Sequence, residues 1–256
     1  MAVDSQASPP SQEAIESAEK LYNAIQMAFP EAVRDFESKW TAWDVVCHSQ
    51  TAPASSLNTY VRTDEFEALK RLGPKTISFV VFKLTRDTDQ NSYGVLLYNA
   101  LENDPNYSVN LDQAIVSKEG LWRYSSQIVE LNYQRNKIVN EHARAWKEHC
   151  QRSWLSSDSD VYTDGEAYWD LLDMGTSIIP HIMVEYHDDP GGFWFQLLHQ
   201  IIHGRKMNAY MFQKRVLFEL WCQFFNKGEH DQAPLYIPTQ MDHRIRPSSF
   251  AEYVPR

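Results

Sequence analysis

The chain has 256 residues, of which 43% are hydrophobic, and it carries a formal net charge of -10 at pH 7. Because nucleic-acid affinity depends on clustered Lys and Arg, this acidic charge excludes a nucleic-acid partner. No stretch approaches the roughly 18 consecutive apolar residues of a membrane span, so we expect no membrane span. The 3 cysteines lack close pairing, which indicates buried thiols in a reducing, cytoplasmic compartment.

The spacing of apolar residues predicts an all-α chain. Residues 1–12 are polar and rich in Ser and Pro, so we expect a disordered N-terminus before a single helical domain over residues 13–232. Residues 233–256 contain four prolines and are expected to form an extended C-terminal tail. Helices are predicted over residues 13–28, 31–47, 64–72, 77–84, 93–102, 118–152, 193–203 and 216–225.

Local signals mark several helix ends. Thr63 is a suitable N-cap for the helix that follows it. Gly204 is a suitable residue for a left-handed cap after the helix that ends at residue 203. Residues 76–82 are β-branched and aromatic enough to fit a strand. Pro180 in the matching downstream segment argues against a paired strand and favours a helix start.

One structural unit occurs twice, about 102 residues apart in the sequence. The matching positions include Trp43 and Trp146, Tyr60 and Tyr162, Gly73 and Gly175, and Tyr93 and Trp194. A repeated apolar skeleton indicates a supersecondary unit that buries its face against its neighbours. We therefore expect two pseudo-equivalent, HEAT-like repeat units over residues 40–103 and 143–206, joined by a long central helix over residues 118–152.

The second copy carries imidazole and indole side chains where the first has ordinary core or surface residues. The exchanges are His181 for Phe79, His199 for Tyr98, His203 for Glu102, Trp169 for Glu67 and Trp194 for Tyr93. Ligand sites combine hydrophobic walls with a few orienting polar groups, so the exchanges predict a pocket in the second unit. The competing interpretation is that these aromatic residues only fill a helical core.

His199 and His203 lie four residues apart, which is the ligand spacing of a zinc-protease helix. Gln200 stands where such enzymes have a general-base Glu, and Gln cannot take a proton from metal-bound water. A zinc peptidase is therefore disfavoured. A non-catalytic metal site with His181 or Glu185 as a third ligand is one alternative. The preferred interpretation has no metal, with both imidazoles satisfied by hydrogen bonds.

Two polar segments have competing interpretations. The acidic turn over residues 186–192 fits a cation or diphosphate site, but paired Asp followed by Pro-Gly-Gly is more simply a turn between helices. In the predicted central helix, residues 129–136 place polar side chains on both helical faces. Glu130, Asn132 and Tyr133 are thus pocket candidates, unless these side chains form a structural network that ties the repeats together.

The sequence lacks a glycine-rich phosphate loop, a Gly-x-Ser-x-Gly elbow and a dinucleotide fingerprint, so we expect no cofactor. Its second copy resembles a group of mostly uncharacterised fungal proteins. The resemblance covers most of residues 40–240 and rests on Tyr168-x-x-Leu171-Leu172-x-x-Gly175, Asp189-x-Gly191-Gly192-Phe193-Trp194 and Leu198-His199-Gln200-Ile201-Ile202-His203-Gly204. Small fungal proteins without cofactor motifs are often accessory cyclases of secondary metabolism. The resemblance therefore implies a cyclase of the same type as the norbornene-forming Diels-Alderase of sordarin-type diterpenoid biosynthesis.

Two functional hypotheses follow. In the first, the protein is a cofactor-independent cyclase or isomerase that folds a hydrophobic terpenoid or polyketide into a reactive conformer for cycloaddition or isomerisation. A donor among His181, His199 and Tyr168 would polarise a substrate carbonyl. The predicted substrate-binding residues are Trp146, Trp169, Trp194, His203, Glu130 and Tyr133. In the second, the chain is a non-catalytic helical-repeat module that binds a protein partner. Both hypotheses leave the oligomeric state open.

Overall fold

The structure is a computed structural model that describes residues 8–49, 58–86, 91–111, 118–153, 156, 159–207 and 214–235. These residues form α-helices and short 3-10 helices, and no β-strand occurs among them. The predicted all-α class is therefore confirmed. Of the two predicted terminal segments, residues 1–7 and 236–256 lie outside the described residues.

The described residues contain helices of two kinds, longer ones and single-turn ones. The longer ones are α1 (Gln12–Ala28), α2 (Pro30–Ser49), α4 (Asp64–Leu72), α5 (Ile77–Thr85), α7 (Gly94–Leu101), α8 (Lys118–Arg152), α9 (Glu166–Asp173), α10 (Ile179–Asp188), α11 (Trp194–His203) and α12 (Lys214–Lys227). The single-turn ones are α3 (Asn58–Val61) and the 3-10 helices η1 (Pro74–Thr76), η2 (Ser159–Thr163), η3 (Gly175–Ile178) and η5 (His230–Gln232). The segment that also fitted a strand is α5, so the helical prediction is confirmed there.

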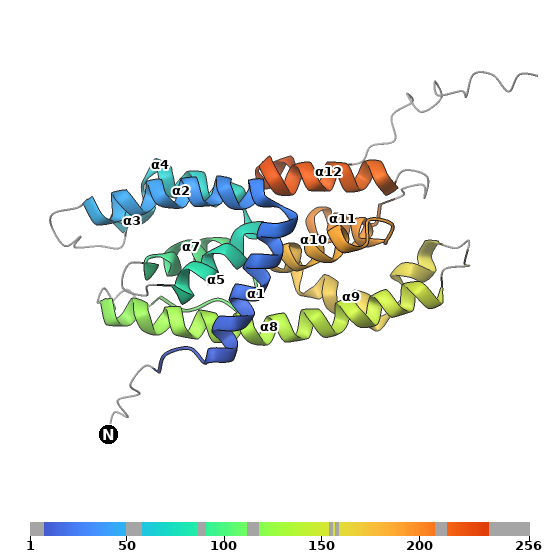
Figure 1. Cartoon of the computed structure of the whole chain (residues 1–256), viewed down its shortest axis with the longest axis horizontal. Helices are drawn as coiled ribbons and strands as arrows, with labels where there is room; N and C mark the ends of the chain where they lie inside the picture. Colours follow the sequence, from blue (N-terminus) through green and yellow to red (C-terminus); the bar gives the residue numbers. More distant parts are fainter. Residues whose placement is uncertain are drawn as a thin grey trace, which may run out of the picture.

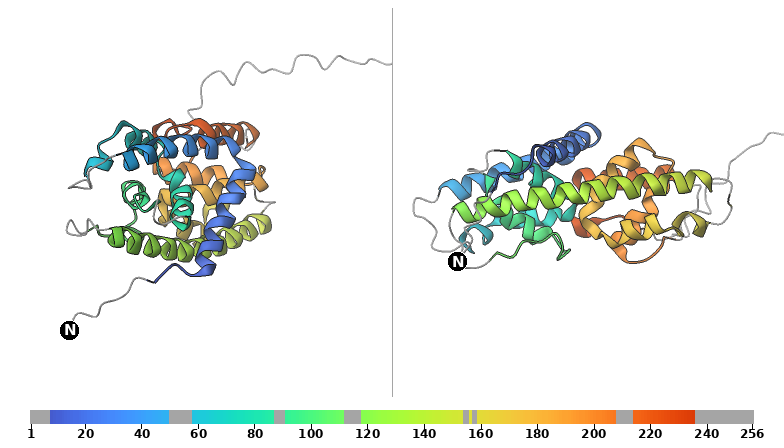
Figure 2. Two further views of the ribbon diagram at one scale, coloured as in Figure 1. Left: turned by 60° about the vertical axis from the view of Figure 1, so that its left-hand side comes forward. Right: turned by 90° about the horizontal axis from the view of Figure 1, so that it is seen from below.

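The long helix α8 runs along one side of the molecule, and α2 and α12 lie along the opposite side (Figure 1). Between them, α5 and α7 occupy one end and α10 and α11 the other, as the turned views also show (Figure 2). Helix α1 crosses the middle, where it contacts α2, α5, α8 and α10. The second half of α8 therefore supports the end of the molecule that contains α9, α10 and α11.

Capping residues set several helix boundaries as the sequence predicted. The Thr63 side chain accepts a hydrogen bond from the backbone N–H of Phe66 at 3.1 Å, which fixes the start of α4. Gly204 ends α11 in the left-handed region with φ 67°. Gly73, just before η1, and Gly175, the first residue of η3, also have positive φ, and both 3-10 helices lead into a buried α-helix.

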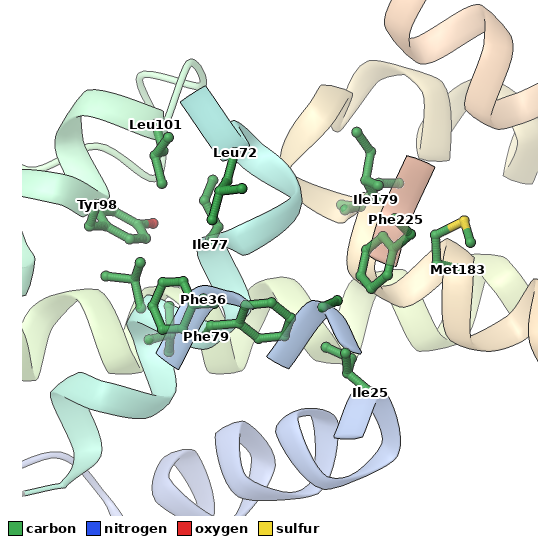
Figure 3. Packing of buried hydrophobic residues seen from close by; sticks show 14 of the residues in the cluster. Ile25, Phe36, Leu72, Ile77, Phe79, Tyr98, Leu101, Ile179, Met183 and Phe225 are labelled. Carbon is green, nitrogen blue, oxygen red and sulfur yellow. The ribbon is translucent and has the colours of Figure 1, made fainter. Parts of the chain in front are cut away.

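The buried apolar side chains form one connected cluster that draws on both halves of the chain. Figure 3 shows Phe36 and Phe79 close together near its centre, with ring centroids 5.2 Å apart. Ile179, Met183 and Phe225 belong to the same cluster and come from the second half of the chain. The two halves therefore share one core.

Positions that match in sequence make matching contacts. The indole N–H of Trp43 donates to the carbonyl oxygen of Tyr60 at 3.0 Å, and that of Trp146 donates to the carbonyl oxygen of Tyr162 at 2.7 Å. The ring of Tyr60 packs on Tyr93 with centroids 4.4 Å apart, and the ring of Tyr162 stacks on Phe193 at 3.8 Å.

The aromatic contacts of Tyr93 and Phe193 correct one pair in the sequence alignment of the two copies. Tyr93 and Phe193 each precede the first residue of a helix, α7 and α11 respectively. The residue that plays the role of Tyr93 is thus Phe193, and not Trp194 as the sequence alignment predicted. The alignment is therefore off by one residue at this position.

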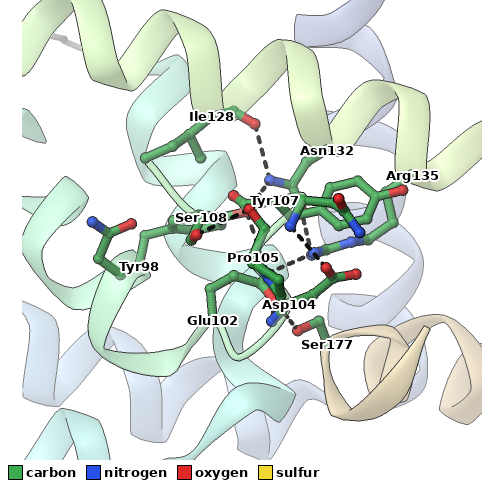
Figure 4. Close-up of polar contacts among 12 residues, drawn as sticks. Tyr98, Glu102, Asp104, Pro105, Tyr107, Ser108, Ile128, Asn132, Arg135 and Ser177 are labelled. Carbon is green, nitrogen blue, oxygen red and sulfur yellow. Dashed lines mark hydrogen bonds and ion pairs between the residues drawn. The ribbon is translucent and has the colours of Figure 1, made fainter. Parts of the chain in front are cut away.

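A buried polar network lies where the two halves meet (Figure 4). The Arg135 guanidinium on α8 pairs with Glu102 at 2.6 Å, and the two side chains are 1% and 0% exposed. The Ser177 hydroxyl of η3 donates to the other Glu102 oxygen at 2.8 Å. Asn132 accepts from Arg135 at 3.1 Å and donates to the Tyr98 hydroxyl at 2.9 Å. Asn132 and Arg135 of the central polar segment therefore belong to a structural network, as the structural interpretation of the sequence held for these side chains.

Replacing Glu102 with Gln should lower the free energy of unfolding by about 3 to 5 kcal/mol, because Arg135 would then carry an unpaired buried charge. Glu67→Gln is the matched control, since Glu67 pairs with Lys70 at 2.7 Å on the surface. The free energy of unfolding of this control variant should fall by no more than about 1 kcal/mol. Denaturant unfolding followed by circular dichroism measures both, and equal losses would contradict the role given to Glu102.

Candidate functional site

A hollow of about 230 Å³ lies between the C-terminal part of α8, η2, the turn before α11 and the first residue of α12. Its lining residues are Trp146, Lys147, Cys150, Gln151, Tyr162, Asp189, Gly191, Gly192, Phe193, Trp194 and Lys214. The hollow is thus in the second half of the chain, where the sequence predicted a pocket.

Four aromatic rings form the apolar wall. Trp146 and Trp194 are buried and meet edge to face, with centroids 4.8 Å apart and planes at 89°. Tyr162 and Phe193 stack with their planes at 17°. The Trp146 indole is fixed by its hydrogen bond to the Tyr162 carbonyl oxygen, so the two pairs hold one another in place.

Lys214 brings an amine to this aromatic wall. Its Nζ lies 3.7 Å from the centroid of the Phe193 ring and donates a hydrogen bond to the carbonyl oxygen of Gly191 at 2.6 Å. Burial lowers the pKa of Lys214, and the nearby charge of Asp189 opposes that shift. Desolvation outweighs the carboxylate, so more of the Lys214 amine is neutral than in a lysine exposed to water.

The other polar lining residues are less available for chemistry. The Lys147 amine forms an ion pair with Glu185 at 3.5 Å. Burial raises the pKa of the Cys150 thiol to about 12, so the thiol stays protonated near neutral pH. Cys150 therefore serves as a small apolar lining group, and a thiolate nucleophile is not expected there.

The turn before α11 is tightly packed against the hollow. The N–H of Gly192 donates to the carbonyl oxygen of Asp189 at 3.0 Å, which closes the turn. The interpretation of this acidic segment as a turn between helices is confirmed. A Cβ on Gly192 would lie 2.5 Å from Asp189 Oδ2 and 2.7 Å from Trp194 Nε1, so no larger residue fits without a shift.

The Trp194 indole N–H is buried and has no hydrogen-bond partner among the described residues. An unsatisfied buried donor costs about 1 to 3 kcal/mol, and such groups are uncommon in native proteins. This donor lies behind Gly192 at the edge of the hollow. Gly192 of the turn therefore packs directly against an unsatisfied polar group.

The structure places the predicted pocket residues in different locations. Trp146 and Trp194 line the hollow, as predicted. Tyr168 is buried behind Trp146, with ring centroids 5.3 Å apart, and its hydroxyl donates to Gln200 at 2.7 Å. Burial raises the pKa of the Tyr168 hydroxyl above its ordinary value, so Tyr168 is a neutral phenol. Trp169 is 44% exposed and does not line the hollow.

The three candidate histidines also lie outside the hollow. His181 is buried and its Nε2 contacts the side-chain oxygen of Asn136 at 2.8 Å. Nδ1 of His199 donates to the carbonyl oxygen of Arg205 at 2.9 Å, and Nε2 of His203 donates to that of Pro234 at 3.0 Å. His199 and His203 thus each make a hydrogen bond, as the structural alternative held. His181 makes one through Nε2, but its Nδ1 is buried without a partner among the described residues.

The His199 and His203 rings lie 4.6 Å apart, but the described residues contain no group of three or more His, Cys, Asp and Glu side chains able to hold a metal ion. The two candidates on the central helix lie elsewhere. Glu130 accepts a hydrogen bond from the backbone N–H of Ser11 at 2.5 Å and so ties the start of α1 to α8. The Tyr133 ring lies 5.1 Å from the Lys137 amine.

Sequence reasoning missed Lys214, Lys147 and Cys150 as lining residues. Lys214 carries no local signal, because its contact with Phe193 joins residues far apart in the chain. The sequence predicted Asp189 only as part of an acidic turn and not as a lining residue of a pocket. Cys150 follows Trp146 by four residues along α8, which places it beside the indole on the same helix face, and this spacing was an available signal. Lys147, one residue after Trp146, had no such signal.

No protein-family model, curated protein or solved structure matched this chain. The resemblance to fungal proteins therefore stays a prediction. Within the described part of the chain, no helix combines the length and the apolar content that a membrane span requires.

Replacing Gly192 with Ala should lower the free energy of unfolding by about 1 to 3 kcal/mol, because the new methyl group overlaps Asp189 and the Trp194 indole. Gly191→Ala is the control, since its nearest neighbour would be Asp189 Oδ1 at 3.9 Å. That variant should keep its stability within about 0.5 kcal/mol. Thermal and denaturant unfolding measure both, and a tolerated Gly192→Ala would show that the turn is loosely packed.

The pKa of His181 makes the stability depend on pH. Burial, with a smaller effect of the Arg135 charge, lowers the pKa of His181 to about 3 from its ordinary 6.5. As the pH falls, the His181 imidazole is protonated in the unfolded chain near pH 6.5 but in the folded chain only near pH 3. The stability that neutral His181 contributes is therefore lost as the pH falls from 6.5 towards 3.

His181→Gln should remove this effect while keeping a donor for Asn136. Wild type should lose about 2 kcal/mol more than the variant between about pH 7 and about pH 5. Urea unfolding at both pH values gives the comparison. Parallel losses in the two proteins would mean that His181 does not titrate as its burial requires.

Proposed function

We propose that the protein binds a small hydrophobic molecule in the hollow and acts on it as a cofactor-independent cyclase or isomerase. The observation that carries the proposal is the combination of four aromatic side chains with Lys214 and Asp189 around one space. Small-molecule sites have this composition, in which apolar walls supply contact area and a few polar groups fix orientation.

The size of the hollow limits the ligand. A space of about 230 Å³ accepts a ring system or a short chain, and a larger molecule would extend out of it. The Trp146 and Trp194 rings meet at 89°, so a flat group can lie against one indole face while the edge of the other indole bounds it. The apolar part of the ligand would thus be held in one orientation.

Catalysis would come from that orientation and from one polar donor. A well-oriented bound conformer lowers the barrier by up to about 7 to 11 kcal/mol in the best cases. The Lys214 amine is the group placed to donate a hydrogen bond to a ligand oxygen in the hollow. In this proposal it takes the role that the sequence had given to His181, His199 and Tyr168.

We also propose that the chain consists of two pseudo-equivalent units. The matching indole–carbonyl hydrogen bonds of Trp43 and Trp146 support two pseudo-equivalent units, of which only the second has developed a ligand site. A terpenoid or polyketide substrate of secondary metabolism remains the proposed class.

A protein-interaction module is the second candidate function. The favouring observation is on α12, where Val216 and Leu220 lie one turn apart and are 51% and 37% exposed. An exposed apolar pair on a helix is a common contact for a partner protein. Val216→Asp with Leu220→Asp would abolish such a partner contact and leave the binding of a small molecule in the hollow unchanged.

Filling the hollow tests the small-molecule proposal. Cys150→Leu should weaken binding of naphthalenemethanol, a flat apolar alcohol, by at least about tenfold, which corresponds to about 1.4 kcal/mol. Tryptophan fluorescence follows the titration because Trp146 and Trp194 line the site.

Cys222→Leu is the matched control, since Cys222 is also half-buried but lies on α12 outside the hollow. It should bind the alcohol like the wild type. Equal affinities of both variants, or no saturable binding by the wild type, would contradict the proposal. Conversion of a compound in an organic extract of the source organism, lost in Lys214→Met, tests the catalytic part.

A further inference from the structure

Lys214 differs from most lysines of the described residues. Six lysines form ion pairs with carboxylates, namely Lys39, Lys70, Lys83, Lys147, Lys206 and Lys227. Among the described residues, no carboxylate lies within ion-pair distance of the Lys214 amine, which instead contacts an aromatic face and one backbone carbonyl. One hydrogen-bond position of this amine is thus used within the turn, and the rest of the group faces the lining of the hollow.

A second lysine with a lowered pKa provides a comparison. Burial lowers the pKa of Lys75 to about 7, but this side chain is 3% exposed. Its amine donates to the carbonyl oxygens of Phe224, Phe225 and Gly228 at the end of α12. A small molecule cannot reach Lys75 without disrupting the core. Lys214 is half-buried and lines a hollow, so it is the desolvated amine that a ligand can meet.

We infer that Lys214 is a covalent attachment site that forms an imine with a ligand aldehyde or ketone in the aromatic hollow. The inference rests on the proposed function, because it places the same kind of ligand in the same space. It adds the substrate class, a hydrophobic carbonyl compound, and the group that activates it.

The reaction needs no further reagent. The lone pair of the neutral Lys214 amine attacks the carbonyl carbon, which forms the C–N bond and moves the C=O π electrons onto oxygen. A proton passes from nitrogen to that oxygen, and the Asp189 carboxylate lines the same hollow as a relay. A second proton, taken from solvent water, then protonates the resulting hydroxyl group. The C–O bond breaks, water leaves, and the nitrogen lone pair completes the C=N bond of a protonated imine, which returns a proton to solvent when it becomes neutral.

The surroundings of Lys214 favour this product. A protonated imine is a cation, and the Phe193 ring 3.7 Å from the amine stabilises a cation over its face. The protonated imine draws electrons from a conjugated ligand more strongly than the parent carbonyl does. A conjugated diene or alkene attached in this way becomes more reactive towards cyclisation or isomerisation. Activation through Lys214 would therefore replace a cofactor.

Reductive trapping of the full chain with naphthaldehyde and cyanoborohydride tests the inference. Peptide mapping by mass spectrometry should find Lys214 labelled about tenfold faster than exposed Lys227, because even a small part of the orientation effect in a bound complex gives that advantage. Lys214→Arg keeps the positive charge but cannot form an imine, so selective labelling should disappear. Lys227→Met should label at Lys214 like the wild type.

The alcohol titration separates this inference from the proposed function. If naphthalenemethanol binds but trapping is spread over surface lysines, the imine inference is overturned and the hydrophobic site stands. If Lys214 is trapped selectively but the alcohol does not bind, the covalent site stands and hydrophobic recognition is overturned. If neither occurs, both are overturned.

Discussion

The buried ion pair between Glu102 and Arg135 is the constraint on which the rest of the fold depends. Two charges removed from water are stable only when they are paired with each other, and here the Ser177 hydroxyl adds a hydrogen bond to the Glu102 carboxylate. Glu102 directly follows α7, Arg135 is on α8 and Ser177 is in η3. Sliding α7 or α8 would leave a buried charge unpaired, and sliding η3 would remove one hydrogen bond from the Glu102 carboxylate. Apolar contacts tolerate small shifts, so the ion pair selects one arrangement among several that would bury similar surface.

This fixed junction also positions the hollow. Helix α8 carries Arg135 in its middle and Trp146 about three turns later, and a continuous helix transmits position along its axis with little freedom. The element η3 leads directly into α10, whose end is the turn with Asp189. The wall from α8 and the wall from the turn are therefore both anchored at the same network. The aromatic pairs then need only local packing to set the shape of the site.

The parts that sequence reasoning predicted are those with local causes. Apolar spacing and the caps at Thr63 and Gly204 act within a few residues, so the helices and many of their ends were predictable. The site was predictable only in part. An imidazole becomes a ligand group or a structural donor according to a distant partner, and the partner of His203 is the Pro234 carbonyl oxygen across the fold. Lys214 was invisible for the same reason, because only tertiary packing brings it to Phe193.

The two halves of the chain provide an internal comparison that isolates what the site has added. The aromatic pair occurs in both, as Tyr60 with Tyr93 and as Tyr162 with Phe193. In the first half the Tyr93 hydroxyl lies 3.4 Å from that of Tyr60, so the pair satisfies its own polar groups. Phe193 has no hydroxyl, and the amine of Lys214 lies over its ring instead. The aromatic pair is thus a structural feature of the fold, and the chemistry specific to the second half is the amine placed beside it.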